Sequence, residues 1–246
     1  MRAFVVYLYI RNKVVAMQTI GLLGGMSWES TQTYYQLLNE GVKESLGGLH
    51  SAKIVLNSVD FAEIEALQHQ GNWPATADIL TEAAQAIERA GADFLLIGTN
   101  TMHKVAPEIQ AGINIPILHI ADATAHALQA AGITRVGLLG TRFTMEQDFY
   151  KQRLIKHFDI DVIIPNETQR NTVHTIIYDE LCLGKIKVES KHTYLSIVDS
   201  LTEQGAQAVI LGCTEIALLI NQVDTQTPLF DTTAIHAKAA VAKALS

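Results

Sequence analysis

Residues 90–100 read AGADFLLIGTN, and residues 204–214, which lie 114 positions further along the chain, read QGAQAVILGCT. In both stretches a glycine precedes a short apolar run, and the run ends at a second glycine followed by a small residue, Thr99 or Cys213. Short runs that are apolar on both faces are typical of buried parallel strands. The two stretches therefore indicate that the chain repeats one structural unit.

Two weaker sequence similarities between the halves occur in the same order along the chain. Residues 20–25 (IGLLGG) match residues 136–141 (VGLLGT) at an offset of 116, and residues 116–118 (PIL) resemble residues 228–230 (PLF) at an offset of 112. Each echo alone could arise by chance, because strand-to-glycine turns look alike in many proteins. Three echoes at nearly one offset predict two structurally similar halves.

The rest of the chain alternates in the same manner. Residues 54–57 and 162–165 form further short apolar runs, and residues 75–90 and 191–204 have the amphipathic pattern of helices. This alternation predicts an α/β fold with parallel sheets. We expect two similar α/β halves related by a pseudo-two-fold axis, with the active site in the cleft between them.

The expected division assigns residues 17–122 together with 230–246 to the first half, and residues 123–229 to the second. In open α/β sheets the ligand cleft lies beyond the carboxyl ends of the strands. Thr99 and Cys213 each stand two positions after the last apolar residue of a predicted strand. Both side chains should therefore line one cleft, and they should approach it from opposite sides.

Composition excludes several classes of partner. The chain has 246 residues, 48% of them hydrophobic, and a net charge of -7, which argues against binding nucleic acid. No apolar run approaches the roughly 20 residues that span a bilayer, so no membrane partner is expected. Cys182 and Cys213 suggest neither a disulfide framework nor a zinc site, which favours a reduced, cytoplasmic location.

The first sixteen residues are interpreted as an upstream extension that precedes a natural start at Met17. An apolar stretch over residues 3–10 is interrupted by Arg11 and Lys13. This interruption does not fit the pattern of a signal peptide.

Cys213 stands at a predicted strand end and just before a predicted helix over residues 216–220. A helix N-terminus stabilises anions, so we expect the thiol to ionise readily. The alternative is a small buried core residue. In the equivalent turn, Thr99, Asn100 and Thr101 could bind a carboxylate through hydroxyl and backbone N–H groups, or could cap a helix.

Three segments, GGMSW (24–28), TNT (99–101) and GCTE (212–215), together resemble the signature segments of the Asp/Glu racemase superfamily. The resemblance runs from about Met17 to the C-terminus and is strongest to the bacterial branch with broad substrate range. It implies a homodimeric amino-acid racemase that uses two opposed bases and needs neither pyridoxal phosphate nor a metal. It also implies that Tyr178 could reach the substrate.

The family usually has a cysteine on each side of the substrate, whereas this chain has Thr99 in the first position. An aliphatic hydroxyl is far too weak an acid to act as a resting base. We therefore expect an asymmetric enzyme in which Cys213 thiolate is the base and Thr99 is an acid or a positioning hydroxyl. By resemblance, the second cysteine takes the proton of the L-isomer, so L-amino acids should react faster.

The remaining site residues are expected to stabilise and enclose the substrate. N–H donors from Asn100, Thr101 and Thr214 could stabilise the enediolate that forms when the α-proton leaves. Glu215 either orients the substrate ammonium or is a favourable anion at a helix N-terminus. The walls of the cleft are expected to include Met26, Met102 and Thr141.

Other patterns carry weaker signals. His119, Asp122 and His126 could form a metal site, but a third strong ligand at helical spacing is missing. Residues 21–25 lack the full dinucleotide fingerprint, and the apolar neighbours of Cys182 predict a core position. Candidate substrates are aspartate, glutamate or a polar analogue such as homoserine. Two alternatives remain: a single-cysteine decarboxylase or isomerase of the same superfamily, and a non-catalytic amino-acid binding protein.

Overall fold

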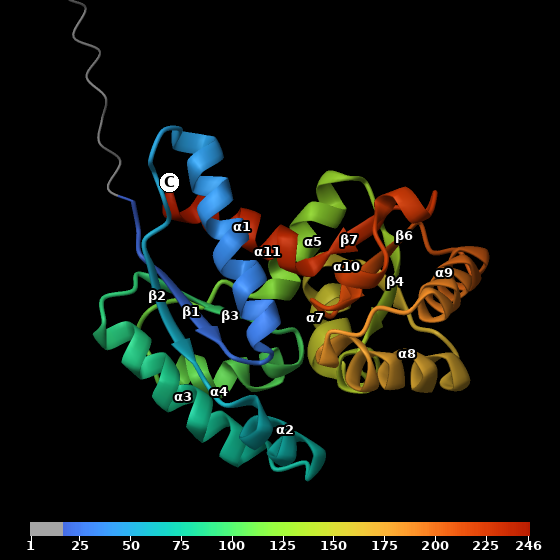
Figure 1. The fold of residues 1–246 in the computed structure, drawn as a ribbon, viewed down its shortest axis with the longest axis horizontal. Helices are drawn as coiled ribbons and strands as arrows, with labels where there is room; N and C mark the ends of the chain where they lie inside the picture. Colours follow the sequence, from blue (N-terminus) through green and yellow to red (C-terminus); the bar gives the residue numbers. More distant parts are fainter. Residues whose placement is uncertain (1–16) are drawn as a thin grey trace, which may run out of the picture.

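The protein is described by a computed structural model that covers residues 17–246, and the fold contains two parallel sheets (Figure 1). The predicted upstream extension, residues 1–16, lies outside the described residues. The first sheet has the strand order β2-β1-β3 and the second has the order β5-β4-β6-β7. Every strand pair in both sheets is parallel, as the α/β pattern predicts.

The first sheet contains β1 (Ile20–Gly24), β2 (Ile54–Ser58) and β3 (Phe94–Ile97). Its helices are α1 (Trp28–Leu46), α2 (Phe61–His69), α3 (Trp73–Arg89) and α4 (Ala106–Ala111), and the 3-10 turn η1 (Thr101–Val105) precedes α4. Side chains from both faces of β1 and β3 are buried. Leu23 and Ile97 pack with α3 in one core, whereas Leu22 and Leu96 pack with α1 in another.

The second sheet contains β4 (Arg135–Gly140), β5 (Asp161–Ile163), β6 (Ala208–Gly212) and β7 (Leu229–Asp231). Its helices are α5 (Ile120–Ala130), α6 (Arg142–Glu146), α7 (Asp148–Phe158), α8 (Glu167–Asp179), α9 (Val188–Glu203) and α10 (Ile216–Leu219), with the 3-10 turns η2 (Leu181–Leu183) and η3 (Gln222–Asp224). One large core joins these elements, and Tyr150 and Tyr194 are fully buried in it.

The repeat in the sequence corresponds to a repeat in topology. β1 and β4 are the central strands, and each pairs with one strand on either side. Residues 116–118, which resemble residues 228–230 in sequence, form only a single parallel bridge, between Ile117 and Leu95. Even so, the N–H of Leu95 bonds to Pro116 O at 2.9 Å, just as the N–H of Val209 bonds to Pro228 O at 2.9 Å. Residues 116–118 therefore occupy the place beside β3 that β7 occupies beside β6.

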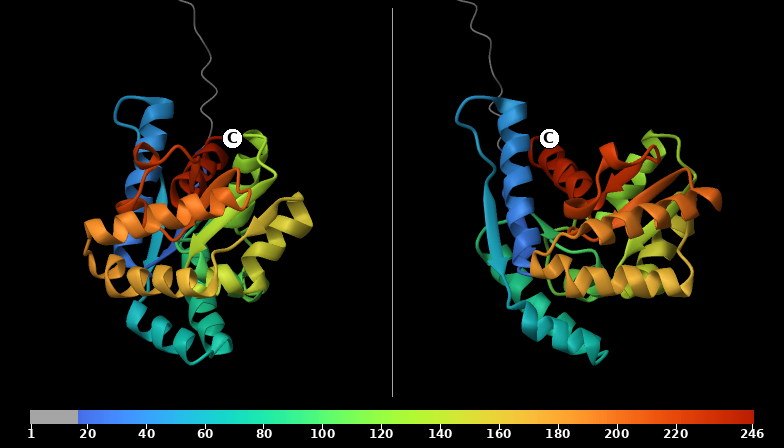
Figure 2. Two further views of the ribbon diagram at one scale, coloured as in Figure 1. Left: turned by 90° about the vertical axis from the view of Figure 1, so that its right-hand side faces the viewer. Right: turned by 45° about the vertical axis from the view of Figure 1, so that its right-hand side comes forward.

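The end of the chain returns to the first sheet. β7 is hydrogen-bonded to β6, and the following helix α11 (Thr232–Ala244) packs against α1 and α5. Ala237, Ala240 and Val241 of this helix belong to the core beneath α1. The two views in Figure 2 show α11 between the two halves. The division of the chain at residues 229 and 230 stays a prediction.

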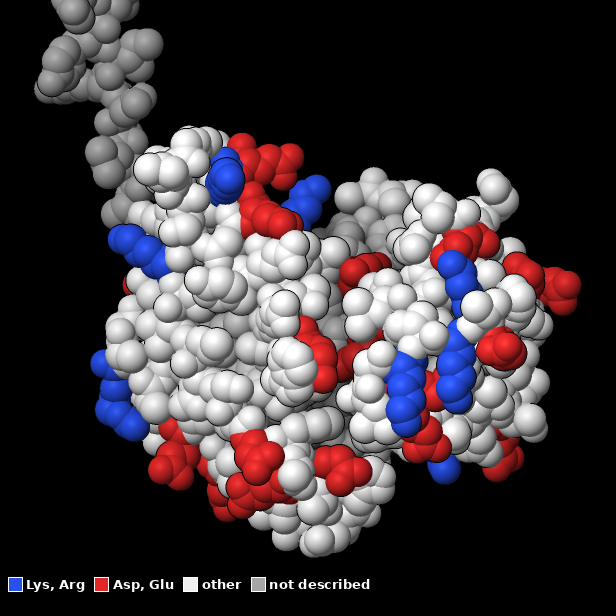
Figure 3. Space-filling model, viewed as in Figure 1, with Lys and Arg blue, Asp and Glu red and all other residues white. Residues whose placement is uncertain are grey.

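The surface mixes charges of both signs. On the face shown in Figure 3, Lys and Arg side chains are interspersed with Asp and Glu and do not form a basic stripe. Within residues 17–246, no helix combines the length and the apolar character needed to cross a membrane.

Candidate active site

A small cavity lies at the carboxyl ends of β3 and β6, and both halves contribute to its wall. Its free volume is about 30 Å³, which is room for about two water molecules. All of the site residues predicted from the sequence line it, namely Met26, Thr99, Asn100, Thr101, Met102, Thr141, Cys213, Thr214 and Glu215. The structure thus brings the predicted set together in one place.

On the β3 side, Asn100 has a fixed orientation and an unused acceptor. Its Nδ2 donates to Thr232 Oγ1 at 3.0 Å, while the Thr232 hydroxyl donates to Leu211 O at 2.9 Å. The Thr232 hydrogen is thereby used, so the Asn100 nitrogen must face Thr232. Asn100 is only 3% exposed, and its Oδ1 has no partner. A buried acceptor without a partner is costly, so this oxygen is suited to receive a donor from a ligand.

Thr101 and Thr141 connect the two halves. Their hydroxyl oxygens lie 3.1 Å apart, and Thr141 also caps α6 by accepting from the N–H of Thr144 at 3.3 Å. Both threonines are buried. Their hydroxyl groups therefore hold the turn after β3 against the turn after β4.

On the β6 side, Glu215 is a buried carboxylate with three hydrogen-bond donors. Its Oε2 accepts from Cys213 Sγ at 2.8 Å and from Thr214 Oγ1 at 2.7 Å, and its Oε1 accepts from Ser27 Oγ at 2.8 Å. Ser30 adds a donor to Thr214 Oγ1 at 2.6 Å. The start of α1 therefore holds the GCTE turn through hydroxyl groups.

The tight turn before α1 places Ser27. Gly25 has a φ of +91°, and a Cβ there would lie 2.2 Å from the carbonyl oxygen of Val59. Only glycine fits this conformation at such close backbone approach. The turn lets Ser27 cap α1 by accepting from the N–H of Ser30 at 3.3 Å while its hydroxyl donates to Glu215.

The expectation that Cys213 ionises readily is wrong for this structure. Burial is the largest effect and raises the pKa of the Cys213 thiol well above its ordinary value, and the adjacent Glu215 carboxylate raises it further. The helix that follows, α10, has only four residues. Its dipole is therefore small and is outweighed by desolvation and a neighbouring negative charge. At rest, Cys213 is a thiol that donates its hydrogen to Glu215.

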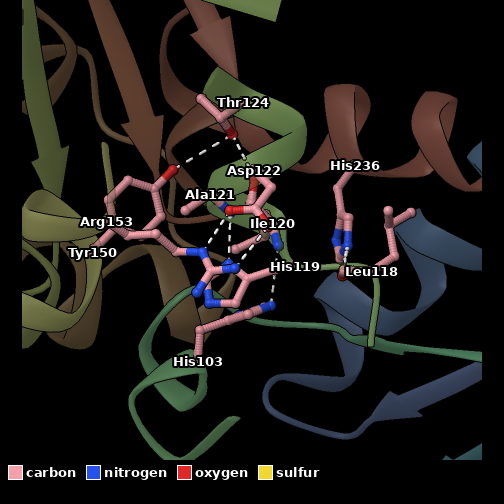
Figure 4. Close-up of polar contacts among 10 residues, drawn as sticks. All are labelled: His103, Leu118, His119, Ile120, Ala121, Asp122, Thr124, Tyr150, Arg153 and His236. Atoms are coloured by element: carbon pink, nitrogen blue, oxygen red, sulfur yellow. Dashed lines mark hydrogen bonds and ion pairs between the residues drawn. The ribbon is translucent and has the colours of Figure 1, made fainter. Parts of the chain in front are cut away.

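His103 and His236 are buried, and they form a cluster with the partly buried His119 (Figure 4). The N–H of Ile120 donates to His103 Nε2 at 3.2 Å, so the ring hydrogen is on Nδ1 and donates to Thr99 O at 2.8 Å. The His119 and His236 ring centroids lie 4.5 and 6.0 Å from that of His103. Burial lowers the pKa of all three, to about 3 for His119 and about 4 for His236.

The possible metal site at His119, Asp122 and His126 is not formed. Asp122 pairs with Arg153 through two hydrogen bonds, and His119 Nδ1 accepts from the N–H of Ala121 at 3.2 Å, as Figure 4 shows. The His126 ring contacts Phe158 edge-on. Among residues 17–246, no group of three or more His, Cys, Asp or Glu side chains is arranged to hold a metal ion.

Two helices close the cavity on its remaining side. Gln68 of α2 is 2% exposed, and its Nε2 donates to the hydroxyl of Tyr178 on α8 at 2.8 Å. Cys182, which the sequence assigned to the core, packs against the core but also lines the cavity. Its pKa is raised to about 12, mainly by burial. Tyr178 also lines the cavity, and its contact with a substrate stays a prediction.

Sequence reasoning missed several lining residues: Phe61, Gln68, Ile177, Cys182 and Gly212. It also missed the part played by Ser27, although Ser27 belongs to the GGMSW segment that carries the resemblance. A serine two residues beyond a glycine turn was an available signal. The residues on α2 and α8 carry no such signal, because the sequence does not show where those helices cross the cleft.

Residues 23–240 match the family model described as Asp/Glu/Hydantoin racemase. The chain belongs to this family. Among curated proteins it is similar to the broad specificity amino-acid racemase RacX of Bacillus subtilis, with 24% identity over 238 residues, covering 92% of this chain and 98% of RacX.

Solved structures agree with this placement. One, of a protein from Yersinia pestis assigned as an Asp/Glu racemase, is 54% identical with a TM-score of 0.88 and covers 94% of this chain and 100% of that chain. Another, of an aspartate racemase homologue from Pyrococcus horikoshii, is 34% identical with a TM-score of 0.82 and the same two coverages. The Asp/Glu racemase resemblance and the two-half α/β fold predicted from sequence are confirmed.

Proposed function

We propose that this family member is a cofactor-independent racemase that interconverts the L- and D-isomers of a small amino acid. The observation that carries the proposal is the placement of Thr99 and Cys213. They follow equivalent strands of the two halves and line the same cavity. Racemisation needs a group that removes the α-proton on one face and a group that returns a proton on the other.

Glu215 supplies a route for forming the thiolate. The Cys213 thiol hydrogen already points at the Glu215 carboxylate across 2.8 Å. When the substrate ammonium enters, its positive charge stabilises the new thiolate, and Glu215 takes the thiol proton. Cys213 then removes the α-proton of the L-isomer, and Thr99 either donates a proton to the opposite face of the carbanion or positions the substrate. Exchange with solvent returns the three groups to their starting states.

The other lining residues bind the substrate and stabilise the carbanion that forms from it. Asn100 Oδ1, which has no partner, accepts from the substrate ammonium. Backbone N–H groups of Asn100, Thr101 and Thr214 stabilise the negative charge that spreads into the substrate carboxylate. Met26, Met102 and Thr141 form walls that exclude water. In this proposal neither pyridoxal phosphate nor a metal takes part.

The test is exchange of the α-proton in D2O, followed by NMR and chiral chromatography over a panel of L- and D-amino acids. We expect deuterium at Cα of the substrate and, with substrate at a saturating concentration, a faster initial rate from the L-isomer. Cys213→Ser should lose several orders of magnitude in rate, and Thr99→Cys should bring the L and D rates together. Equal initial L and D rates in the unmodified protein, measured at saturating substrate, would contradict the assigned roles.

The same experiment separates the alternatives. A decarboxylase would release carbon dioxide, and a non-catalytic amino-acid binding protein would be stabilised by its ligand without turnover and would be unaffected by Cys213→Ser. We further propose that the active unit is a homodimer, and that residues 17–122 with 230–246 and residues 123–229 are its two structural halves.

A further inference from the structure

A second cavity lies between the two halves, and among the described residues it shares no lining side chain with the active-site cavity. Its free volume is about 400 Å³, within the roughly 300–1,000 Å³ typical of small-molecule sites. η1, α4 and residues 117–119 form one wall, and α7 forms the other. We infer that this cavity is a second binding site, which takes a small organic anion: a carboxylate or phosphate group on an apolar body.

Two side chains in the wall have N–H donors that are free to bind the anionic group. Arg153 uses Nε and Nη2 to pair with Asp122 (Figure 4), which leaves Nη1 without a partner among the described residues, and its side chain is 36% exposed. His119 Nδ1 accepts from the N–H of Ala121, so its ring hydrogen is on Nε2 and can be donated. An arginine N–H makes a strong, charge-assisted hydrogen bond to a carboxylate or phosphate.

The charges around the cavity favour an anion. Within the part of the chain that the structure describes, no Asp or Glu side chain lines it. Lys104 does line it, and its ammonium donates to a neutral acceptor, Gln147 Oε1, at 2.6 Å. Burial is the main cause that lowers the pKa of His119 to about 3, and the positive charge of Arg153 lowers it further. The pair with Asp122 therefore leaves a positive potential at this wall, which attracts an anion.

The rest of the wall fits an apolar body. Pro107, Ile117 and Phe149 line the cavity. Gln110 lines it too, but its amide is engaged: Nε2 donates to Ile115 O at 3.0 Å, and Oε1 accepts from the N–H of Ile117 at 2.8 Å. An inorganic ion would leave the apolar surface in water, whereas an apolar body on the anion would cover it.

His103 connects this cavity to the active site. Its ring lines the second cavity, while its Nδ1 donates to Thr99 O at 2.8 Å. A ligand that contacts η1 and α7 together stabilises the present arrangement, in which the active-site cavity has a free volume of about 30 Å³. We expect the lining of that cavity to move when a substrate enters and a product leaves, so the bound anion should lower kcat.

Matched small molecules test binding by calorimetry. Phenyl phosphate and benzoate carry an anionic group on an apolar body, benzamide has the shape of benzoate without its charge, and inorganic phosphate has the charge without the body. We expect the organic anions to bind at least about tenfold more tightly than benzamide or inorganic phosphate, and the tighter of the two identifies the anionic group. Benzamide binding as tightly as benzoate, or no binding of either organic anion, overturns the inference.

Variants test the location of the bound anion. Arg153→Gln should weaken phenyl phosphate binding about tenfold or more. Arg142→Gln, which replaces a half-exposed arginine in the wall of a different cavity, should change the affinity by less than about twofold. His119→Asn can keep the cap on Ala121 and removes the Nε2 donor, so it provides the test if thermal unfolding shows that Arg153→Gln does not fold. Wild-type affinity in the folded variant contradicts the assignment of the site.

Kinetics test the connection to the active site. With amino-acid substrate at a saturating concentration, phenyl phosphate should lower kcat for α-proton exchange about fivefold or more, and Arg153→Gln should remove the effect at the same ligand concentration. Competitive inhibition with unchanged kcat would place the anion in the active site and contradict the inference. If no amino acid exchanges, the racemase proposal fails, and calorimetry on the variants still decides whether the second site exists.

Discussion

Glu215 receives its hydrogen bonds from Cys213, Thr214 and Ser27, so one buried carboxylate joins the thiol to the start of α1. If it takes the thiol proton, replacing it with an amide of equal size should remove the acceptor and preserve the packing. We expect Glu215→Gln to lower the rate of α-proton exchange about 100-fold to 1,000-fold at neutral pH. Part of the rate should return at alkaline pH, where the thiol ionises without help.

A matched control keeps the carboxylate. Ser27→Ala removes one donor to Glu215 but leaves the contact with Cys213, so its rate should fall less than about tenfold. The measurement is the rate of α-proton exchange as a function of pH for the wild type, Glu215→Gln and Ser27→Ala. A Glu215→Gln enzyme with the wild-type rate at pH 7 would show that Cys213 does not depend on this carboxylate.

His103 fixes the backbone beneath Thr99 without lining the active-site cavity. His103→Leu leaves Thr99 O and the N–H of Ile120 buried without their present partner, which should cost about 1–3 kcal/mol of unfolding free energy. His103→Asn can keep the donor to Thr99 O, so it should retain more stability and more of kcat. Urea unfolding and steady-state kinetics measure the two effects. Equal kcat in the two variants would contradict a positioning role.

At the scale of elements, α2 and α8 line one side of the active-site cavity. Its free volume is only about 30 Å³, and we expect these helices or their side chains to move when a substrate enters. Tyr178→Phe removes the acceptor of the Gln68 hydrogen bond, so α2 amides should exchange with deuterium faster than in the wild type. Hydrogen-exchange mass spectrometry measures this, with α9 as the internal reference. Unchanged protection of α2 would place the opening elsewhere.

The elements also show what the sequence can predict. Thr99 and Cys213 could be paired because parallel strands in equivalent positions end at one edge of each sheet. The protonation state of Cys213 could not be predicted from the sequence. It depends on burial and on the Glu215 carboxylate, and the helix that follows Cys213 is only one turn long. Cys182 was assigned to the core because its sequence neighbours are apolar. Its place at the cavity depends on how η2 meets α8, which is a tertiary property.

At the scale of the molecule, His103, His236 and the partly buried His119 lie where several elements of the two halves meet. His236 of α11 donates from Nε2 to Leu118 O at 2.7 Å, and its Nδ1 accepts from Tyr34 of α1 at 2.8 Å. His119 caps α5, and His103 belongs to η1. Each ring makes its present contacts in the neutral form. Protonation would place a charge in this junction, beside Arg153 and the other two histidines.

The whole fold should therefore lose stability in mild acid. The histidine pKa values are lower in the folded state, at about 3 for His119 and about 4 for His236, than the 6.5 of the unfolded chain. The contribution of the neutral histidines to the free energy of unfolding is complete above pH 6.5. It is lost as the pH falls towards 4, by up to about 1.4 kcal/mol per pH unit for each histidine. Urea unfolding between pH 7 and pH 4.5 measures the slope.

Replacing His119 distinguishes the effect of its protonation on stability from the effect of its packing. In His119→Asn, the asparagine can still accept from the N–H of Ala121 as a helix cap, but it cannot take up a proton. We expect its stability near pH 7 to lie within about 1 kcal/mol of the wild type. The free energy of unfolding that the variant loses per pH unit should be smaller than the wild-type loss by about 1.4 kcal/mol. If His119→Asn and the wild type lose stability in parallel, acid sensitivity arises outside the His119 ring.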